Sequence, residues 1–237
     1  MLILFILFVI IVLIFSYLLR IHLHIDFGSF FRKSFEKQDD KFGLYVYNGV
    51  QGCGKTYSAV KFCNKMQKLN NYIIITNVKS YCNNENIIYM DNILEIIKYV
   101  IDNSVETERS KYLIFFDEIF TVLMKQKVVN QDILSFLAQL RKRGIIFVST
   151  AQNWSEIPIS FRRFCRYQIN CNMFAVPILP KQAFLLNTVC DGYNAKWDSM
   201  QQDFIAPVLQ TNFAKGERRI INMYDTFETI KTFNLKQ

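Results

Sequence analysis

From Phe42 onward, short apolar runs alternate along the chain with longer stretches in which apolar residues recur every three or four positions. The short runs predict β-strands, and the longer stretches predict amphipathic helices. The expected strands cover residues 44–48, 72–76, 112–116 and 145–150, and the expected helices cover residues 55–69, 91–101 and 133–140. Asp91 is the expected N-cap of the second helix, and Gly144 ends the third. Such alternation is typical of an α/β domain with a mainly parallel sheet flanked by helices.

The alternation weakens after Trp154. Residues 166–171 predict a fifth strand, and further apolar runs occupy residues 182–189 and 204–209. The pattern alone does not fix the boundaries of the elements beyond about residue 172.

The N-terminal residues 1–19 form a continuous apolar run without a charged side chain. As a helix, such a run would be about 28 Å long, which is enough to cross the hydrocarbon core of a membrane. Arg20 follows it directly, and Arg32, Lys33 and Lys37 lie in the mixed-charge segment of residues 20–41. We therefore expect one N-terminal transmembrane helix, a juxtamembrane linker over residues 20–41, and a domain that faces the cytoplasm.

Composition and charge narrow the class of protein. Apolar residues make up 51% of the 237 positions, which excludes a disordered or fibrous chain. The 28 Lys and Arg residues exceed the 20 Asp and Glu residues, and the net charge of +8 favours nucleic acid or an acidic membrane surface as a partner. The six cysteines form no Cys-x-x-Cys pair, so we expect free thiols in a reducing compartment.

A phosphate-binding loop follows the first predicted strand. The segment consists of Gly49, Val50, Gln51, Gly52, Cys53, Gly54, Lys55 and Thr56. It matches the pattern Gly-x-x-x-x-Gly-Lys-Ser/Thr, whose glycines let backbone N–H groups surround phosphate oxygens at the start of a helix. Lys55 can reach the β- and γ-phosphates of ATP, and the Thr56 hydroxyl can bind Mg²⁺. The sequence thus predicts a P-loop NTPase with ATP and Mg²⁺ as its ligands.

Polar residues end two of the other predicted strands. Asp117 and Glu118 follow the apolar run of residues 112–116. Asp117 is expected to hold Mg²⁺, and Glu118 to orient and deprotonate the water that attacks the γ-phosphate. Gln152 follows the next strand and can contact the γ-phosphate or the attacking water, and Thr150 is a lesser candidate for the same task.

Basic residues form three clusters in the second half of the chain. Arg162 and Arg163 lie where a ring-forming ATPase can present an arginine finger to its neighbour, although a salt bridge or a nucleic-acid contact explains them equally well. Arg141–Arg143 end a predicted helix, where they also suit the helix dipole. Lys215, Arg218 and Arg219 suit a phosphate backbone or an acidic lipid. No base-reading motif is present, so any nucleic-acid contact is expected to tolerate different sequences.

Several of these segments together resemble a known family. They are the loop GVQGCGKT, the strand YLIFFDE, the helix end LRKRG, the segment IIFVSTAQNWSEIPISFRRF, and Asn222–Thr226 near the C-terminus. They are similar to the Zot-type ATPase domain of filamentous phage assembly proteins, within the FtsK–HerA group of P-loop ATPases. The resemblance covers approximately residues 42–226, and it implies one ATPase domain over these residues, followed by a C-terminal tail of residues 227–237.

The resemblance implies an oligomeric, membrane-bound ATPase that extrudes single-stranded phage DNA through the host cytoplasmic membrane. The implied partners are other copies of the chain, single-stranded DNA or phage nucleoprotein, and other phage assembly or coat proteins. By position, Lys55 and Thr56 would be the loop residues, Asp117 and Glu118 the acidic pair, and Gln152 the sensor. Two further classes stay open: a DNA-packaging or conjugative ATPase, and a membrane adaptor that binds nucleotide without hydrolysing it.

Overall fold

The computed structural model describes residues 6–14, 42–81, 86–104, 111–119, 131–176, 179–200 and 202–225. The chain divides into two compact units, Met1–Asp39 and Asp40–Gln237. In the first unit, residues 6–14 are helical and their apolar side chains are exposed. No helix within the described part of the chain is both long and apolar enough to span a bilayer. The rest of the predicted span, the linker of residues 20–41 and the tail of residues 227–237 lie outside the described residues.

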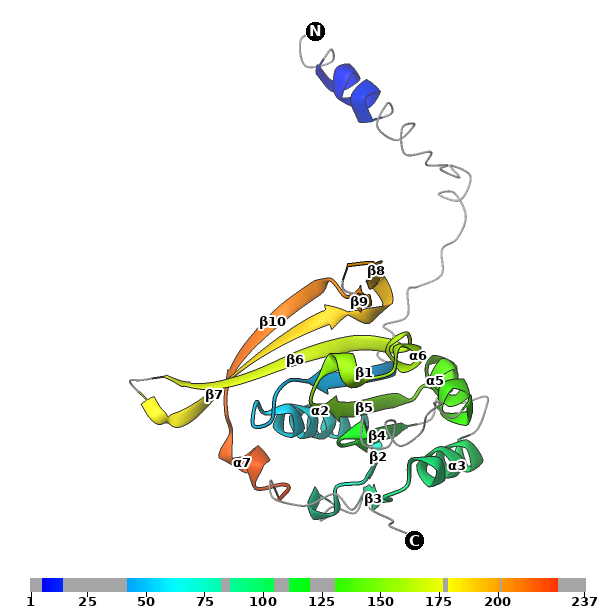
Figure 1. The fold of residues 1–237 in the computed structure, drawn as a ribbon, viewed down its shortest axis with the longest axis vertical. Coiled ribbons are helices and arrows are strands. Elements are labelled where there is room, and N and C mark those ends of the chain that lie inside the picture. Colours follow the sequence, from blue (N-terminus) through cyan, green and yellow to red (C-terminus); the bar gives the residue numbers. More distant parts are fainter. Residues whose placement is uncertain are drawn as a thin grey trace. The chain divides into compact units, whose positions relative to one another are not determined.

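The second unit is an α/β domain (Figure 1). Its strands are β1 (Gly43–Asn48), β2 (Ile73–Thr76), β3 (Ile87–Tyr89), β4 (Tyr112–Phe116), β5 (Ile146–Ala151), β6 (Cys165–Val176), β7 (Leu179–Asp191), β8 (Lys196–Asp198), β9 (Asp203–Ile205) and β10 (Val208–Lys215). Its α-helices are α2 (Lys55–Asn70), α3 (Ile93–Asn103), α5 (Gln131–Arg143), α6 (Ile159–Arg162) and α7 (Arg218–Ile221). Short 3₁₀ helices cover Lys79–Tyr81, Trp154–Glu156 and Gly192–Asn194. The strands and helices predicted up to Thr150 are therefore confirmed, with small changes at their ends.

Eight strands form one sheet in the order β10-β7-β6-β1-β5-β4-β2-β3. All neighbours from β6 to β3 are parallel, whereas β7 pairs antiparallel with both β6 and β10. The prediction of a mainly parallel sheet is confirmed. Strand β5 lies between β1 and β4 in the centre of the sheet. The phosphate-binding loop, the acidic pair and Gln152 therefore follow the carboxyl ends of three neighbouring parallel strands.

Helices cover both faces of the sheet. The side chains of each strand alternate between the two faces, so the apolar central strands present a hydrophobic surface on both sides. Tyr45 and Tyr47 of β1 belong to the core that α2 covers. Leu44 and Val46 of the same strand belong to the opposite core, which α3 and α5 cover. The central strands are buried on both faces, as the continuous apolar run of β4 indicates.

Two local predictions about helix ends differ in outcome. The N-cap of α3 is Asn92 rather than Asp91, because the Asn92 side chain accepts a hydrogen bond from the backbone N–H of Leu94 at 3.0 Å. Gly144 does end α5, with φ at +67°, a left-handed conformation in which glycine is least strained. Both ends therefore follow ordinary capping chemistry.

The antiparallel part of the sheet, formed by β6, β7 and β10 and called the arm below, was only partly predicted. The expected strand at residues 166–171 and the apolar run at residues 182–189 are fragments of β6 and β7, which have 12 and 13 residues. The apolar run at residues 204–209 is not one strand, since Ala206 and Pro207 separate β9 from β10. Pro207 lacks a backbone N–H, but its carbonyl accepts a hydrogen bond from Asp191 at 2.8 Å.

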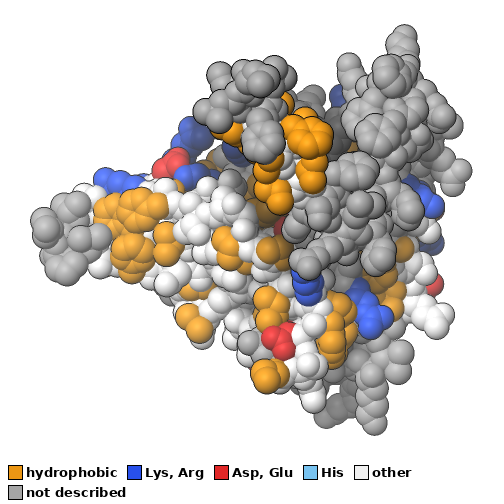
Figure 2. Space-filling model, turned by 90° about the horizontal axis from the view of Figure 1, so that it is seen from above, with side chains coloured by type: hydrophobic (Ala, Val, Ile, Leu, Met, Phe, Trp, Pro, Cys, Tyr) orange, Lys and Arg blue, Asp and Glu red, His pale blue; other side chains and the backbone are white. Residues whose placement is uncertain are grey.

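The arm exposes an aromatic cluster. The rings of Phe174, Phe184 and Phe213 lie 5.6, 6.1 and 6.3 Å apart between centroids. Phe174 and Phe213 are 39% and 61% exposed. Figure 2 shows hydrophobic side chains gathered toward the narrow end of the domain. One face of the arm thus presents apolar surface to solvent, while its other face contributes to the α2 side of the sheet.

Candidate active site

The phosphate-binding loop connects β1 to α2 and depends on backbone conformations that favour glycine. Gly49, Gly52 and Gly54 have φ values of +144°, +80° and +85°. A methyl group on Gly49 would lie 2.7 Å from both the Cys171 carbonyl oxygen and the Cys53 Sγ atom. The loop therefore packs directly against β6, and a side chain at Gly49 would have no room.

The start of α2 is left open to an anion. Its N-cap residue, Gly54, provides no side-chain hydrogen bond, and the first turn contains no acidic residue. The initial backbone N–H groups of a helix need partners, and an uncapped N-terminus favours negative charge. Lys55 is 9% exposed, and its Nζ atom donates a hydrogen bond to the Val50 carbonyl at 3.0 Å. These features fit the phosphates of ATP. When ATP binds, the Lys55 ammonium would leave the Val50 carbonyl and bind a phosphate oxygen instead.

Asp117, directly after β4, lies beside the loop. The Thr56 hydroxyl donates to its two carboxylate oxygens at 3.1 and 3.3 Å, and the Thr150 hydroxyl donates to Oδ1. The residue is 8% exposed. Its pKa is raised from 3.8 to about 6, mainly by burial and also by the nearby Glu118, while the two threonines and Lys55 oppose the rise. The carboxylate is thus held at an energetic cost, which is typical of functional sites.

Asn77 and Thr150 fix the backbone around this carboxylate. The Asn77 side chain accepts from the Asp117 N–H at 2.8 Å and donates to the Asp117 carbonyl at 3.0 Å. The Glu118 N–H donates to the Thr150 hydroxyl at 2.8 Å. Glu118 itself has φ at +53°, a conformation that costs a non-glycine residue about 1 kcal/mol. These contacts maintain the strain, as is common at functional sites.

The hydroxyl of Thr56 and the carboxylate of Asp117 are the oxygen ligands that Mg²⁺ prefers, usually together with water and phosphate oxygens. Their separation of 3.1 Å shows that one cation could contact both. The residues therefore fit the metal that P-loop ATPases employ. When bound, the metal would neutralise charge on the phosphates, and Asp117 would be its anchor.

The structure brings the predicted residues of the loop, the acidic pair and Gln152 together, and it gives Thr150 a larger part in the site than expected. The carboxyl ends of β1 and β4 bring together Lys55, Thr56, Asp117 and Glu118. Gln152 is half-buried directly after β5, between those two strands. Thr150, the lesser candidate, is the residue of β5 that contacts both members of the acidic pair. Its position two residues before Gln152 was the signal available in the sequence.

A C-terminal segment also reaches the site. Tyr224 is 8% exposed, and burial together with the charges of Asp117 and Tyr57 raises its pKa to about 12. The segment is attached to α2, because the Glu217 N–H donates to the Tyr57 hydroxyl at 2.8 Å and Lys61 forms a 2.6 Å ion pair with Glu217. Tyr224 is predicted only as part of a family motif, and no local pattern in the sequence connects it with Asp117.

Arg162 differs from the expectation of an arginine finger. Its side chain is 7% exposed and forms an ion pair with Asp203. It also donates to the carbonyls of Ile157 and Ser155 at 2.6 and 3.1 Å. A finger must extend into a neighbouring subunit, whereas this guanidinium is surrounded by its own chain. Arg163 is exposed, with its guanidinium 5.8 Å from the centroid of the Phe204 ring, so it is accessible to a neighbouring subunit or to nucleic acid.

We expect Arg162→Ala to lower the free energy of unfolding by about 2 kcal/mol, because it leaves Asp203 and two carbonyls without their partner. Arg163→Ala removes the same side chain from the surface and should change stability by about 0.5 kcal/mol or less. Urea unfolding of both variants measures the difference. Equal stabilities would contradict the structural role assigned to Arg162.

Comparison with known proteins identifies the family. A family model described as the ATPase family associated with various cellular activities (AAA) matches residues 45–173. The chain belongs to this family. The match spans the phosphate-binding loop, the acidic pair and Gln152, so the AAA assignment covers every predicted site residue between β1 and β6. The protein is accordingly an ATP-hydrolysing enzyme built on a P-loop fold.

Three solved structures illustrate the similarity of this AAA domain to other proteins. The N-terminal domain of zonular occludens toxin from Neisseria meningitidis is 15% identical over 77% of this chain and 98% of that chain, with a TM-score of 0.49. The genome packaging NTPase B204 of Sulfolobus turreted icosahedral virus 2 is 14% identical over 73% and 100%, with a TM-score of 0.46. The flagellar accessory protein FlaH of Methanocaldococcus jannaschii is 15% identical over 73% and 88%, with a TM-score of 0.43. No curated protein matches the sequence significantly.

Proposed function

We propose that this AAA-family ATPase is a membrane-anchored motor that couples ATP hydrolysis to the export of single-stranded DNA during filamentous phage assembly. The observation that carries the ATP-hydrolysing part of this proposal is the buried Asp117 carboxylate, which Thr56 and Thr150 hold next to the phosphate-binding loop. This is an arrangement for hydrolysing ATP rather than only binding it, because Glu118 follows at once in a strained conformation.

The proposed roles follow from the positions of the residues. The loop of residues 49–56 binds the phosphates, and Lys55 neutralises charge that develops on the γ-phosphate. Thr56 and Asp117 hold Mg²⁺. Glu118 accepts the proton of the attacking water, and Gln152 contacts the water or the γ-phosphate.

Charge and sequence support the remaining parts of the proposal. The net charge of +8 and the exposed Lys215, Arg218 and Arg219 favour a nucleic-acid partner that is bound through its phosphates. The apolar run of residues 1–19 favours a single span in the host cytoplasmic membrane, with the ATPase domain in the cytoplasm. The resemblance to Zot-type domains supports a homo-oligomer that works with phage coat and assembly proteins.

The test is to prepare the full chain from a membrane fraction and measure ATP hydrolysis without DNA, with single-stranded DNA and with duplex DNA. We expect single strands to raise the rate about tenfold, and we expect the Lys55→Ala control to be inactive because it lacks the charge on the transferred phosphate. Stimulation by duplex alone would replace the export motor by a packaging motor. Recovery of the chain in the soluble fraction without detergent would contradict the membrane anchor.

A further inference from the structure

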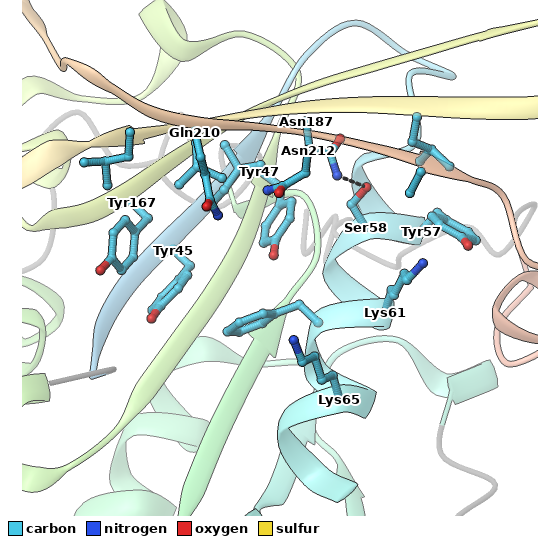
Figure 3. A pocket seen from close by; sticks show the side chains of 16 residues that line it. Tyr45, Tyr47, Tyr57, Ser58, Lys61, Lys65, Tyr167, Asn187, Gln210 and Asn212 are labelled. Carbon is cyan, nitrogen blue, oxygen red and sulfur yellow. Dashed lines mark hydrogen bonds between the residues drawn. The ribbon is translucent and has the colours of Figure 1, made fainter. Parts of the chain in front are cut away.

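A groove of about 610 Å³ lies on the α2 side of the sheet, and none of residues 49–56 lines it (Figure 3). Tyr45 and Tyr47 of β1 and Tyr167 of β6 form its floor. The floor is aromatic because these rings pack on one another and on Phe62, with the Tyr45 centroid 5.0 Å from those of Phe62 and Tyr167. The groove exists because α2 covers only part of this face, and the arm extends the sheet beyond it.

The two walls of the groove differ in chemistry. Helix α2 contributes Lys61 and Lys65, while the arm contributes the amides of Asn187, Gln210 and Asn212 (Figure 3). None of the described residues that line the groove is Asp or Glu. The Asn187 Nδ2 atom donates to Ser58 at 2.9 Å, whereas its buried Oδ1 atom has no hydrogen-bond partner within the described structure. The groove therefore offers cations on one side, amides on the other and aromatic rings between them.

We propose that this groove binds a stretch of single-stranded DNA, with the phosphates along the lysines of α2 and the bases directed toward the tyrosines and amides of the arm. The inference rests on the proposed function and gives its nucleic-acid partner a location. A strand carries negative charge along one edge and flat, partly apolar bases along the other, which matches the two walls. Aromatic and amide contacts of this kind tolerate many sequences.

The length of the groove and its aromatic floor favour a single strand over a duplex. The residues of α2 that line it run from Tyr57 to Lys65, a distance of about 12 Å along the helix. That length suits about two nucleotides of an extended strand, whereas the bases of duplex DNA are paired and stacked and cannot turn toward the aromatic floor. An acidic peptide would use the lysines but would leave the aromatic floor and the amides without a role.

Two residues that line the groove link it to the surroundings of the ATPase site. Lys61 lines the groove and pairs with Glu217 at 2.6 Å, and Glu217 is the N-cap of α7, after which the chain continues to the buried Tyr224. A phosphate on Lys61 would compete with Glu217. Leu185 lines the groove as well, and a methyl group on Gly54 would lie 2.9 Å from its Cδ2 atom. A strand bound in the groove can thus affect the C-terminal segment through Lys61 and Glu217, and the phosphate-binding loop through Leu185 and Gly54.

The first experiment compares two charge reversals on one helix. Lys65 lines the groove, whereas Lys68 is exposed on α2 outside it. We expect Lys65→Glu to weaken binding of fluorescein-labelled dT15 to the full chain about tenfold at 0.15 M salt, and Lys68→Glu to weaken it less than about twofold. Fluorescence anisotropy without nucleotide measures both. Equal losses would mean diffuse attraction to a basic surface and would overturn the proposal.

The second experiment locates the bound strand. An oligonucleotide carrying 5-iodouracil, irradiated on the wild-type chain, should crosslink to the peptides that contain Tyr45, Phe62 or Tyr167, and Asn212→Leu should reduce the yield. Crosslinks confined to other peptides, or competition by polyglutamate as effective as that by dT15, would overturn the groove. Because binding is measured without ATP, a chain that hydrolyses ATP but does not bind dT15 refutes the groove alone. A chain that binds dT15 there without hydrolysis refutes the motor.

Discussion

Glu118→Gln is expected to bind ATP as well as the wild-type chain does and to hydrolyse it at least about a hundredfold more slowly, the usual contribution of a general base. Glutamine has the shape of glutamate but cannot accept the proton of the attacking water. The backbone contact from the Glu118 N–H to Thr150 does not depend on the side chain, so the position of Asp117 should persist. The effect is therefore expected on the chemical step and not on binding.

Single-turnover hydrolysis and titration with a fluorescent ATP analogue measure the two quantities separately. Glu95→Gln is the matched control, since it makes the same chemical change at an exposed residue of α3, outside the site. A hydrolysis rate for Glu118→Gln close to that of Glu95→Gln would show that another group accepts the proton. A loss of ATP binding would show instead that Glu118 holds the loop or the metal.

The parts of the site that the sequence predicted are contiguous along the chain. The phosphate-binding loop occupies eight successive residues, and Asp117 and Glu118 follow an apolar strand directly. Their chemistry is therefore visible in a local pattern. Asn77 was missed because its partner, Asp117, is 40 residues away, and one asparagine after a strand is equally typical of an ordinary turn. Its position at the end of β2 was the available signal.

The arm was harder to predict than the parallel core. The central strands are buried on both faces and give continuous apolar runs, whereas β10 is exposed along most of its length and mixes Gln210, Thr211 and Asn212 with Phe213. Its pairing with β7 depends on contacts between residues such as Asn187 and Asn212, which no short window contains. The groove follows from that pairing and so could not be expected from the sequence either.

Asp117→Asn is expected to abolish hydrolysis and, at the same time, to stabilise the ligand-free fold. The activity is lost because an amide cannot replace the carboxylate as an anchor for Mg²⁺. The stability rises because the wild-type folded state must bury a charge that Thr56, Thr150 and Lys55 offset only in part. A pKa of about 6 in the folded chain against an ordinary 3.8 corresponds to about 3 kcal/mol at pH 7.5.

The pH dependence identifies the cause of this gain. Because the folded pKa is raised, the wild-type fold binds the proton more tightly than the unfolded chain does, and it loses stability as the pH rises from about 4 to about 6. Asparagine does not titrate, so its advantage should be full at pH 7.5, where it amounts to about 6 °C in Tm, and roughly half as large at pH 5. Asp102→Asn, at an exposed position of α3, should show no such gain.

Calorimetry of the ligand-free wild type, Asp117→Asn and Asp102→Asn at the two pH values decides the matter, and added Mg²⁺ and ATP extend it. A cation next to Asp117 would neutralise the buried charge that destabilises the wild-type fold. Mg²⁺ with ATP should therefore raise the Tm of the wild type much more than that of Asp117→Asn. A gain that does not change with pH would mean that better packing, not the removal of a buried charge, stabilises the variant. Equal shifts with Mg²⁺ and ATP would mean that Asp117 does not hold the metal. Together, the two results would show whether this site trades stability for the capacity to hydrolyse ATP.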